Sequence, residues 1–249
     1  MEKAYKRFLE LRDVWSTDSR VRAVLGLGSL SRPARMDVWS DLDFFLIVED
    51  GTKNQFLNNP SWLDVPHNGF VFQNTPDGFK ALTRGDIFVE CAVFTFDELQ
   101  HIPYDRPHVF YLRHEQDASR IPQKVQPIMR HDKSYCLNEA ITNLYIGVSR
   151  AKRGETFAAM TMIQSYAFMH YIRAVTPPFP EGVEEDPYVL QRRFEQAFPH
   201  QVRILKDVLL GYDHVQASAR ALFECIKKEM PSHPLYPLID ALLDEGLGQ

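Results

Sequence analysis

The residues best suited to chemistry lie in one short stretch of the sequence, residues 24–50. An apolar run ends there in Gly28 and Ser29, and Asp41 and Asp43 introduce the next apolar run. Gly28 lets a backbone amide approach a phosphate closely, and the Ser29 hydroxyl can donate to the same oxygens. Side chains two apart on a strand point to one face, so Asp41 and Asp43 can share a hard cation such as Mg²⁺. The pattern predicts a phosphate site beside a metal site.

Further polar side chains between the two halves of this motif belong to the same candidate site. We expect a helix from about Ser31, whose N-terminus would point at the phosphates. Arg32 and Arg35 can reach additional phosphate oxygens as bidentate donors. For each of them, an exposed side chain that contacts only solvent is an equally good alternative. Ser40, which directly precedes Asp41, completes the set of predicted nucleotide-binding residues.

A third carboxylate lies in a later apolar run, residues 87–96. The carboxylate belongs to Glu90. The rest of the run is apolar or nearly so, and we therefore expect both faces of its strand to be buried. A buried carboxylate without a partner is costly, so Glu90 should be protonated, paired or bound to a metal, and a metal fits best. If its strand lies beside that of Asp41, three carboxylates converge as a two-metal phosphoryl-transfer site requires.

Strands and helices must hold these residues in place. The β-branched and apolar runs predict three strands, at residues 21–27, 42–48 and 87–96. Because continuous apolar strands are typical of sheets covered on both faces, we expect flanking helices, one of them over residues 1–15. The Asn- and Pro-rich stretch 54–80 should add a short helix and a strand over residues 69–73.

The pattern changes near residue 130, beyond which apolar residues recur with the helical period. Residues 157–171 are apolar around most of a helical circumference, which predicts the central helix of a bundle. Asp213 is placed to cap another helix, and residues 176–187 should form a loop. The expected fold class is therefore α/β (α+β), a mixed sheet with flanking helices followed by a C-terminal helical bundle.

Composition and charge exclude several classes of protein. With 249 residues, 45% of them apolar, the chain can bury a sizeable core, and a net charge of -5 argues against a main role in binding nucleic acid. No apolar run approaches the roughly 20 residues of a membrane helix, and residues 1–15 lack the apolar core of a signal peptide, so we expect a cytoplasmic protein. Three distant cysteines without a CxxC motif favour buried free thiols.

The order of the motif residues resembles that of a known superfamily. Gly28, Ser29, Asp41, Asp43 and Glu90 match the Gly-Ser pair, the Asp-x-Asp motif and the later carboxylate of the nucleotidyltransferase superfamily that includes DNA polymerase β. Within it, the chain is most similar to the lincosamide and aminoglycoside antibiotic nucleotidyltransferases. The similarity also covers three segments, residues 18–29, 84–103 and 151–173. It therefore extends over most of the chain.

The resemblance implies an activity and a domain arrangement. A nucleotidyltransferase domain over residues 1–130 would be followed by a helical acceptor-binding domain over residues 131–249, with the acceptor site between them. The enzyme would transfer a nucleoside monophosphate, with AMP from ATP favoured, to a hydroxyl group of a small molecule such as an antibiotic. The resemblance further implies two Mg²⁺ ions, no membrane partner and a homodimer.

The same resemblance gives roles to single residues. Asp41 and Asp43 would bind one Mg²⁺, and Glu90 would share the second, where it could also accept the proton of the attacking hydroxyl. The Gly-Ser pair would hold the outer phosphates. Glu155 follows Gly154 at the start of a long helix and could orient the acceptor, although a helix N-terminus stabilises a glutamate without any such role.

Two other classes of function stay open on the sequence alone. The protein could be a nucleotidyltransferase-like binding protein that acts through a partner, as in toxin–antitoxin pairs, or it could transfer AMP to a protein. The presence of all three carboxylates counts against a binding protein without catalysis. A nucleic-acid polymerase or tRNA-modifying enzyme is disfavoured by the acidic balance and by the absence of a basic segment interleaved with aromatic residues.

Overall fold

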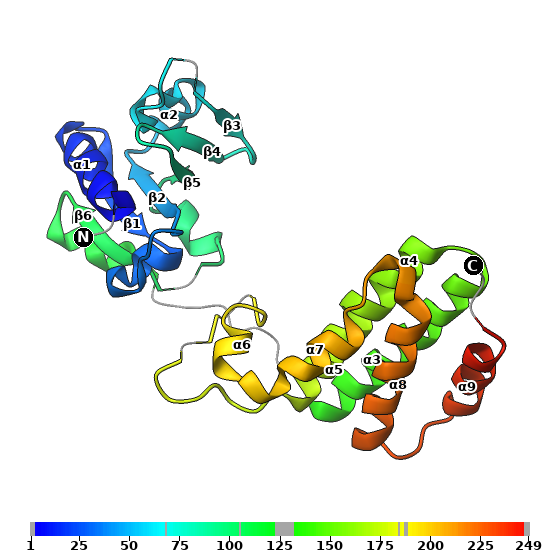
Figure 1. The fold of residues 1–249 in the computed structure, drawn as a ribbon. Helices are drawn as coiled ribbons and strands as arrows, with labels where there is room; N and C mark the ends of the chain where they lie inside the picture. The colour runs from blue at the N-terminus through cyan, green and yellow to red at the C-terminus, as the bar shows by residue number, and fades with distance from the viewer. Residues whose placement is uncertain are drawn as a thin grey trace. The chain divides into compact units, whose positions relative to one another are not determined.

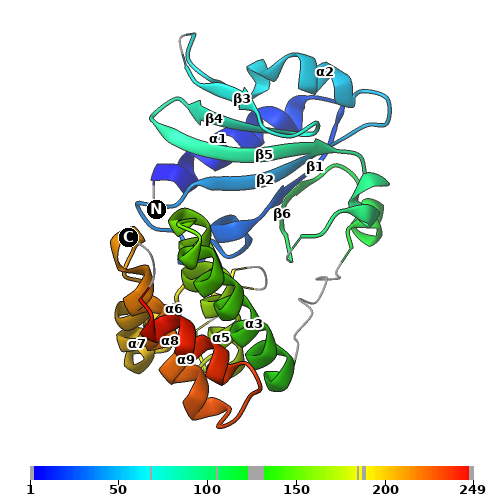
Figure 2. The same ribbon diagram turned by 90° about the vertical axis from the view of Figure 1, so that its right-hand side faces the viewer.

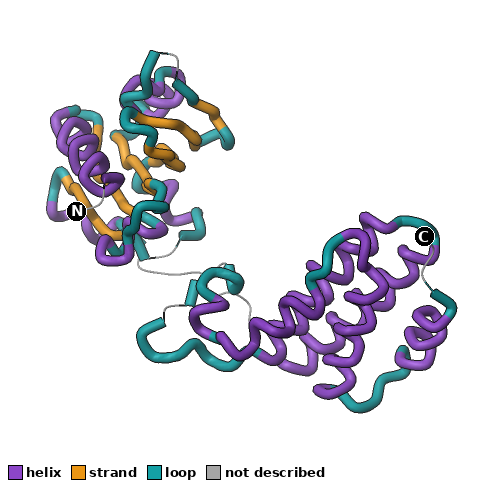
Figure 3. Tube along the Cα trace, viewed as in Figure 1, coloured by secondary structure: helices purple, strands orange, loops and turns teal. Residues whose placement is uncertain are grey.

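The computed structural model describes residues 3–246 except 68, 105, 123–131, 184, 187 and 188. The chain divides into two compact units, Met1–Gln126 and Pro127–Gln249 (Figure 1). Strands are found in the first unit, and the described part of the second unit is built from helices and loops (Figure 3). The domain boundary expected at residue 130 lies outside the described residues.

A mixed six-stranded sheet forms the centre of the first unit. Its strands are β1 (Val21–Gly26), β2 (Leu42–Val48), β3 (Val71–Gln73), β4 (Gly78–Thr83), β5 (Ile87–Phe94) and β6 (His108–Leu112). Its flanking helices are α1 (Lys3–Thr17) and α2 (Lys53–Asn58). The spatial order is β3-β4-β5-β2-β1-β6, with β2 and β5 parallel in the middle and the other pairs antiparallel (Figure 2). The expected fold class is confirmed.

The strands expected from apolar runs are present, but β4 and β6 are not among them. β4 has Lys80 near its middle, between Phe79 and Ala81, which are buried on the opposite face. β6 is an edge strand of five residues that begins at His108 and stays partly exposed. Polar residues at such positions interrupt the apolar pattern from which strands are recognised.

The two faces of the sheet are covered to different extents. On one face, helices α1 and α2 enclose an aromatic core in which Phe8 packs against Trp15 and Phe44, with ring centroids 6.1 and 5.5 Å apart. On the other face, buried apolar residues within the segment 96–121 pack on β1 and on the C-terminal parts of β2 and β5, at Ile47 and Phe94. That segment covers only one end of the face. The end that carries Glu90 stays open to solvent.

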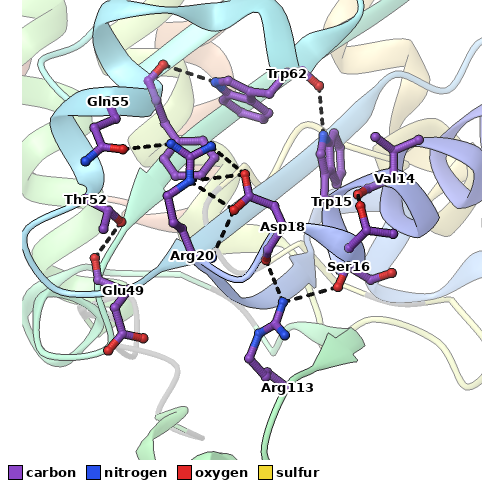
Figure 4. A network of polar contacts seen from close by, with 12 residues as sticks. Val14, Trp15, Ser16, Asp18, Arg20, Glu49, Thr52, Gln55, Trp62 and Arg113 are labelled. Carbon is purple, nitrogen blue, oxygen red and sulfur yellow. Dashed lines mark hydrogen bonds and ion pairs between the residues drawn. The ribbon is translucent and has the colours of Figure 1, made fainter.

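A polar network holds the turn between α1 and β1 (Figure 4). Arg20 and Asp18 form an ion pair with an N–O distance of 2.5 Å, and Arg20 also donates to Gln55 on α2. Arg113, just beyond β6, donates to the backbone carbonyl oxygens of Asp18 and Ser16. The hydrogen bond from Arg20 lowers the pKa of Asp18 below its ordinary value. The network therefore joins α1, α2 and β6 at one turn.

Helices make up the second unit around one apolar core. They are α3 (Lys133–Lys152), α4 (Thr156–Met160), a π-helical segment (Thr161–Ala167), α5 (Phe168–Val175), α6 (Phe194–Ala197), α7 (Val202–Val208), α8 (Val215–Glu229) and α9 (Tyr236–Asp244). Among the described residues, none of the helices has the length and apolar character needed to cross a membrane.

Two expectations for the helical unit are wrong in detail. The helix expected over residues 157–171 is present, but its middle is π-helical, and Phe157 and Tyr166 are exposed. A π-turn contains an extra residue, so the side chains after it face directions that α-helical periodicity does not predict. Asp213 does not cap α8, because it lies in a 3₁₀ turn and His214 occupies the position before the helix, without a side-chain capping bond.

The three cysteines are free thiols, as expected from their spacing. Cys91 and Cys136 are buried and Cys225 is half-buried. Burial raises the pKa of each of these thiols. They are therefore neutral packing residues at physiological pH and take no part in the chemistry considered below.

Candidate active site

Strands β2 and β5 bring two of the predicted carboxylates together. In the parallel register of these strands, Asp43 lies directly beside Glu90. Neighbouring strands are about 4.8 Å apart and paired residues point to the same side, so both carboxylates rise from one face of the sheet. The expected adjacency of the Asp41 and Glu90 strands is confirmed. Asp41 lies half-buried, one residue before β2 begins.

Gly28 and Asp43 are packed against each other. The chain leaves β1 through Leu27, whose amide donates to the Asp43 carbonyl oxygen at 2.7 Å. Gly28 then adopts a φ of +49°, in the left-handed region that favours glycine. A Cβ at this position would overlap Asp43 Oδ2. Glycine is therefore required at position 28 for two reasons: the backbone conformation and the close approach of the Asp43 carboxylate.

The Ser29 hydroxyl is buried and has no hydrogen-bond partner among the described residues. A buried polar group without a partner costs about 1–3 kcal/mol, so such a group in a turn calls for an explanation. A phosphate oxygen would accept a hydrogen bond from the hydroxyl and remove this cost. The chemistry of the Gly-Ser turn therefore fits the binding of an anion.

The helix expected from about Ser31 is not formed. Gly28–Ser31 and Pro33–Arg35 are short 3₁₀ turns, separated by Arg32 with an extended φ of -140°. Proline cannot donate a backbone hydrogen bond, and the residue before it avoids helical angles, so Pro33 interrupts a helix here. The expected helix dipole is therefore missing from the site. Arg32 is exposed, and the side chain of Arg35 lies outside the described part of the structure.

The residues just before Asp41 form a turn that is held by Asp37. Ser40 Oγ accepts from the amide of Asp37 and donates to Asp37 Oδ1, both at 3.0 Å. The same Oδ1 accepts from the amide of Trp39 at 2.9 Å, while the Trp39 side chain is 89% exposed. The Ser40 hydroxyl thus stabilises the turn, and its predicted contact with a nucleotide stays a prediction.

Glu90 is not buried, contrary to the sequence analysis. Its side chain is 45% exposed, because the segment 96–121 does not cover this end of the sheet face. Lys80 lies opposite Glu90 in the register of β4 and β5, with Nζ 3.4 Å from Oε2. Asn74 donates to Glu90 Oε1 at 3.5 Å. Burial therefore gives no reason to place a metal here; the strand register and the carboxylate oxygens are what suit Glu90 to a metal.

The three carboxylates do not form a closed ligand set. Within the described residues, no three His, Cys, Asp or Glu side chains are close enough to hold a metal ion together. Asp43 and Glu90 nevertheless share one register position, and carboxylate oxygens suit Mg²⁺. Mg²⁺ is commonly held by one or two carboxylates together with substrate phosphates. Asp41, Asp43 and Glu90 therefore fit an ion that arrives with a phosphorylated ligand.

Glu155 lies in the second unit, at the junction of α3 and α4. Arg150 Nη1 donates to Glu155 Oε2 at 2.7 Å, which lowers the pKa of this exposed carboxyl group. Glu155 therefore carries a negative charge at neutral pH. Its predicted contact with an acceptor stays a prediction.

The second unit also contains a cavity of about 410 Å³. The π-helical segment contributes Gln164 and Ser165 to its wall, and apolar side chains such as Phe168 and Leu205 form much of the rest. The Gln164 side chain is held by two hydrogen bonds to the backbone of Gly211, at 2.8 and 3.0 Å. A mostly apolar cavity of this size, with a few fixed polar groups, is typical of small-molecule sites.

Lys80 and Asn74 are neighbours of Glu90 that the sequence analysis did not single out. Both were missed because β4 was not recognised as a strand. The alternation of Phe79, Lys80 and Ala81 is the signal that could have identified Lys80. A polar residue between two apolar ones on a strand points to the face opposite theirs.

Comparisons with protein-family models and with curated proteins give no match. Among solved structures, an aminoglycoside 6-adenyltransferase from Bacillus subtilis is similar over 98% of this chain and 98% of its own, with 14% identity and a TM-score of 0.38. A nucleotidyltransferase-like protein from Exiguobacterium sibiricum is similar over 91% of this chain and 74% of its own, with 11% identity and a TM-score of 0.31. At these values neither similarity establishes a family for the chain.

Proposed function

We propose that the protein is a Mg²⁺-dependent nucleotidyltransferase that transfers AMP from ATP to a hydroxyl group of a small molecule. The observation that carries the proposal is the position of Asp43, which neighbours Glu90 in the sheet and packs on Gly28. One side chain thereby connects the Gly-Ser turn, whose chemistry fits anion binding, with a second carboxylate, that of Glu90. Phosphoryl transfer needs these parts side by side, because the metal ligands must reach the phosphate that reacts.

Each carboxylate has a task in this reaction. Asp41 and Asp43 would bind the ion that organises the triphosphate, and Glu90 would share in binding a second ion. When bound, Mg²⁺ offsets the charge on the α-phosphate and lowers the pKa of the attacking hydroxyl. Glu90, which is open to solvent, would accept the proton of that hydroxyl. The acceptor oxygen bonds to the α-phosphorus, the bond to the bridging oxygen of the β-phosphate breaks, and pyrophosphate leaves.

The Gly-Ser turn would hold the outer phosphates of the nucleotide. Ser29 supports this role because its buried hydroxyl lacks a partner among the described residues. Arg32 lies at the end of the same turn and is exposed, so its guanidinium group would add a donor to the phosphates there. Arg35 and Ser40 complete the proposed set of nucleotide contacts.

The helical residues 131–249 would bind the acceptor. The cavity of about 410 Å³ supports this assignment because its mixture of apolar walls and a few polar groups suits a small molecule. Glu155 is exposed and ionised, so it could pair with an amine on the acceptor. Lincosamide and aminoglycoside antibiotics, the acceptors implied by the resemblance, carry such amines. A cytoplasmic homodimer belongs to the same proposal.

Mass spectrometry of an antibiotic panel tests the proposal. The purified protein is incubated with Mg²⁺, one of the four ribonucleoside triphosphates and each compound, with pyrophosphate release measured in parallel. We expect one compound to gain the mass of a nucleoside monophosphate residue, with ATP as the best donor. The Asp41→Asn variant, which removes one ligand charge at constant volume, should give no product. Modification of an added protein, with every small molecule unchanged, would favour protein AMPylation instead.

A further inference from the structure

A row of side chains crosses four strands of the sheet at the height of the carboxylates. Phe72 on β3 pairs with Lys80 on β4, Lys80 pairs with Glu90 on β5, and Glu90 pairs with Asp43 on β2. Residues that pair across neighbouring strands point to the same face. Lys80 therefore stands on the open face that bears the two carboxylates, one strand further out than Glu90.

The ion pair between Lys80 and Glu90 is weak and accessible. Nζ and Oε2 are 3.4 Å apart, and the two side chains are 38% and 45% exposed. Half-exposed pairs of this kind contribute little to stability, because water and salt screen the charges. The protein therefore loses little when a stronger partner takes either group.

Lys80 and a metal ion would compete for the same carboxylate. Glu90 forms an ion pair with Lys80 and accepts a hydrogen bond from Asn74. Among the described residues, no three His, Cys, Asp or Glu side chains are grouped closely enough to hold a metal ion. A divalent cation on Glu90 repels a neighbouring ammonium group, so its arrival frees Lys80. The backbone of Lys80 stays about one strand spacing from that of Glu90, so the freed ammonium remains on the open face beside the carboxylates. A compact, strongly hydrated cation in such a place is suited to a phosphate oxygen.

We propose that Lys80 is a phosphate-binding residue that exchanges partners, from Glu90 to a phosphate oxygen of the nucleotide when a divalent cation occupies Glu90. The inference rests on the proposed nucleotidyltransferase function and deepens it. Before the metal–nucleotide complex binds, Lys80 neutralises the outermost carboxylate of the row. Afterwards it offsets part of the negative charge of the nucleotide phosphates.

The exchange predicts effects of opposite sign when Lys80 is replaced. Lys80→Met keeps most of the length of the side chain and removes its charge. Without nucleotide, the variant should bind Mn²⁺ about two- to fivefold more tightly, because the competing cation is gone. It should bind the Mn²⁺ complex of a non-hydrolysable ATP analogue about five- to tenfold more weakly, because a charge-assisted contact to phosphate is lost.

Electron paramagnetic resonance of free Mn²⁺ and isothermal titration with the ATP analogue measure the two affinities. Lys80→Arg, which keeps the charge, should stay close to the wild type in both, and Lys6→Met on α1 serves as the control for loss of an exposed lysine. If Lys80→Met does not fold, as judged by circular dichroism, Lys80→Gln replaces it in both measurements.

The outcomes separate the inference from the proposed function. If Lys80→Met loses affinity both for Mn²⁺ alone and for the Mn²⁺ complex of the ATP analogue, or if neither affinity changes, the proposed exchange of partners is overturned. If the wild type binds the analogue and Mn²⁺ while the variant behaves identically, this inference alone fails. If the wild type binds neither, the proposed function fails as well.

Discussion

Polar side chains on the open end of the sheet are placed by strand register, whereas part of the cavity wall in the helical unit comes from a π-helical break in helical periodicity. On the sheet, Asp43, Glu90 and Lys80 are consecutive members of one cross-strand row, so their spacing follows from backbone hydrogen bonding. In the helical unit, the π-helical segment displaces Gln164 and Ser165 from α-helical positions, and both line the cavity.

The difference suggests a division of labour between the two regions. A register-defined row holds charges at nearly constant separations, as the chemistry of phosphoryl transfer requires. A cavity lined by apolar side chains tolerates changes in size and shape, so it can adapt to different small molecules. Changes in the carboxylate row should therefore abolish the reaction, and changes in the cavity should alter which acceptor is used.

The largest effect is expected from Asp43→Asn. The variant loses the carboxylate that joins the Gly-Ser turn to the row, so the rate of transfer should fall by about a thousandfold or more, with little effect on the fold. Steady-state kinetics with the identified acceptor, together with circular dichroism, measure both. Asp50→Asn, an equivalent change in the loop after β2, should keep the wild-type rate. Equal rates in the two variants would remove Asp43 from the site.

A smaller but informative effect is expected from Gly28→Ala. Gly28 and Gly51 both have positive φ values, +49° and +78°, but a Cβ at Gly28 overlaps Asp43 Oδ2 while nothing lies within 4 Å at Gly51. Each alanine should cost about 1–2 kcal/mol in the free energy of unfolding from backbone strain. Only Gly28→Ala should also displace the carboxylate and reduce the rate of transfer by tenfold or more, on the order expected for misplaced catalytic groups.

Chemical denaturation and kinetics on the two glycine variants separate strain from displacement. An equal loss of activity in both would show that strain in the first unit, and not the position of Asp43, limits the reaction.

The cavity offers the converse test. Ser165→Leu places a larger apolar side chain in the cavity wall, so the Michaelis constant for the acceptor should rise severalfold while the affinity for the ATP analogue stays constant. Tyr166→Leu changes the next residue of the π-helical segment, which is exposed, and should leave both constants unchanged. A fall in nucleotide affinity for Ser165→Leu alone would contradict the division of labour.

The smallest effect concerns the scaffold of the first unit. Because Arg20 lowers the pKa of Asp18, the ionised carboxylate stabilises the fold above its ordinary pKa of 3.8, and this stabilisation is lost as the pH falls through the lowered value. Asp18→Asn should therefore lower the free energy of unfolding by about 0.5–1 kcal/mol at pH 7, with the difference shrinking toward zero in acid. Denaturation at pH 7 and pH 3 measures it.

The transfer rate per folded molecule should not change in Asp18→Asn, since the turn lies outside the carboxylate row. Asp13→Asn, at an exposed position of α1, is the control for removing a surface charge. A difference between wild type and Asp18→Asn that grew in acid would contradict the assigned direction of the pKa shift.

Local patterns were sufficient for the elements with continuous apolar sequences. β1, β2 and β5 are buried on one or both faces along most of their length, and their hydrophobic runs predicted them. β4 and β6 were missed because each has side chains that face solvent, and a short strand with mixed polarity is hard to distinguish from a loop. The missing β4 also concealed the position of Lys80.

The exposure of Glu90 could not be predicted for a related reason. An apolar strand indicates that other elements pack on the sheet. Which part of a sheet face they bury depends on where a segment distant in sequence packs. Residues 96–121 pack over β1 and the C-terminal ends of β2 and β5, and they leave Glu90, nearer the N-terminal end of β5, open to solvent. Similarly, Pro33 is visible in the sequence, yet its consequence for the expected helix was apparent only from the backbone angles around Arg32.

The sequence by itself determined the types of chemical group and their order along the chain: a Gly-Ser pair, two spaced aspartates and a later glutamate, each next to a strand-forming run. The tertiary structure decided which groups meet. The register that sets Asp43 beside Glu90, the contact of Asp43 with Gly28, and the pairing of Lys80 with Glu90 all join residues distant in sequence. Periodicity reports how one segment meets solvent or core, whereas partners across strands are selected by the packing of the whole sheet.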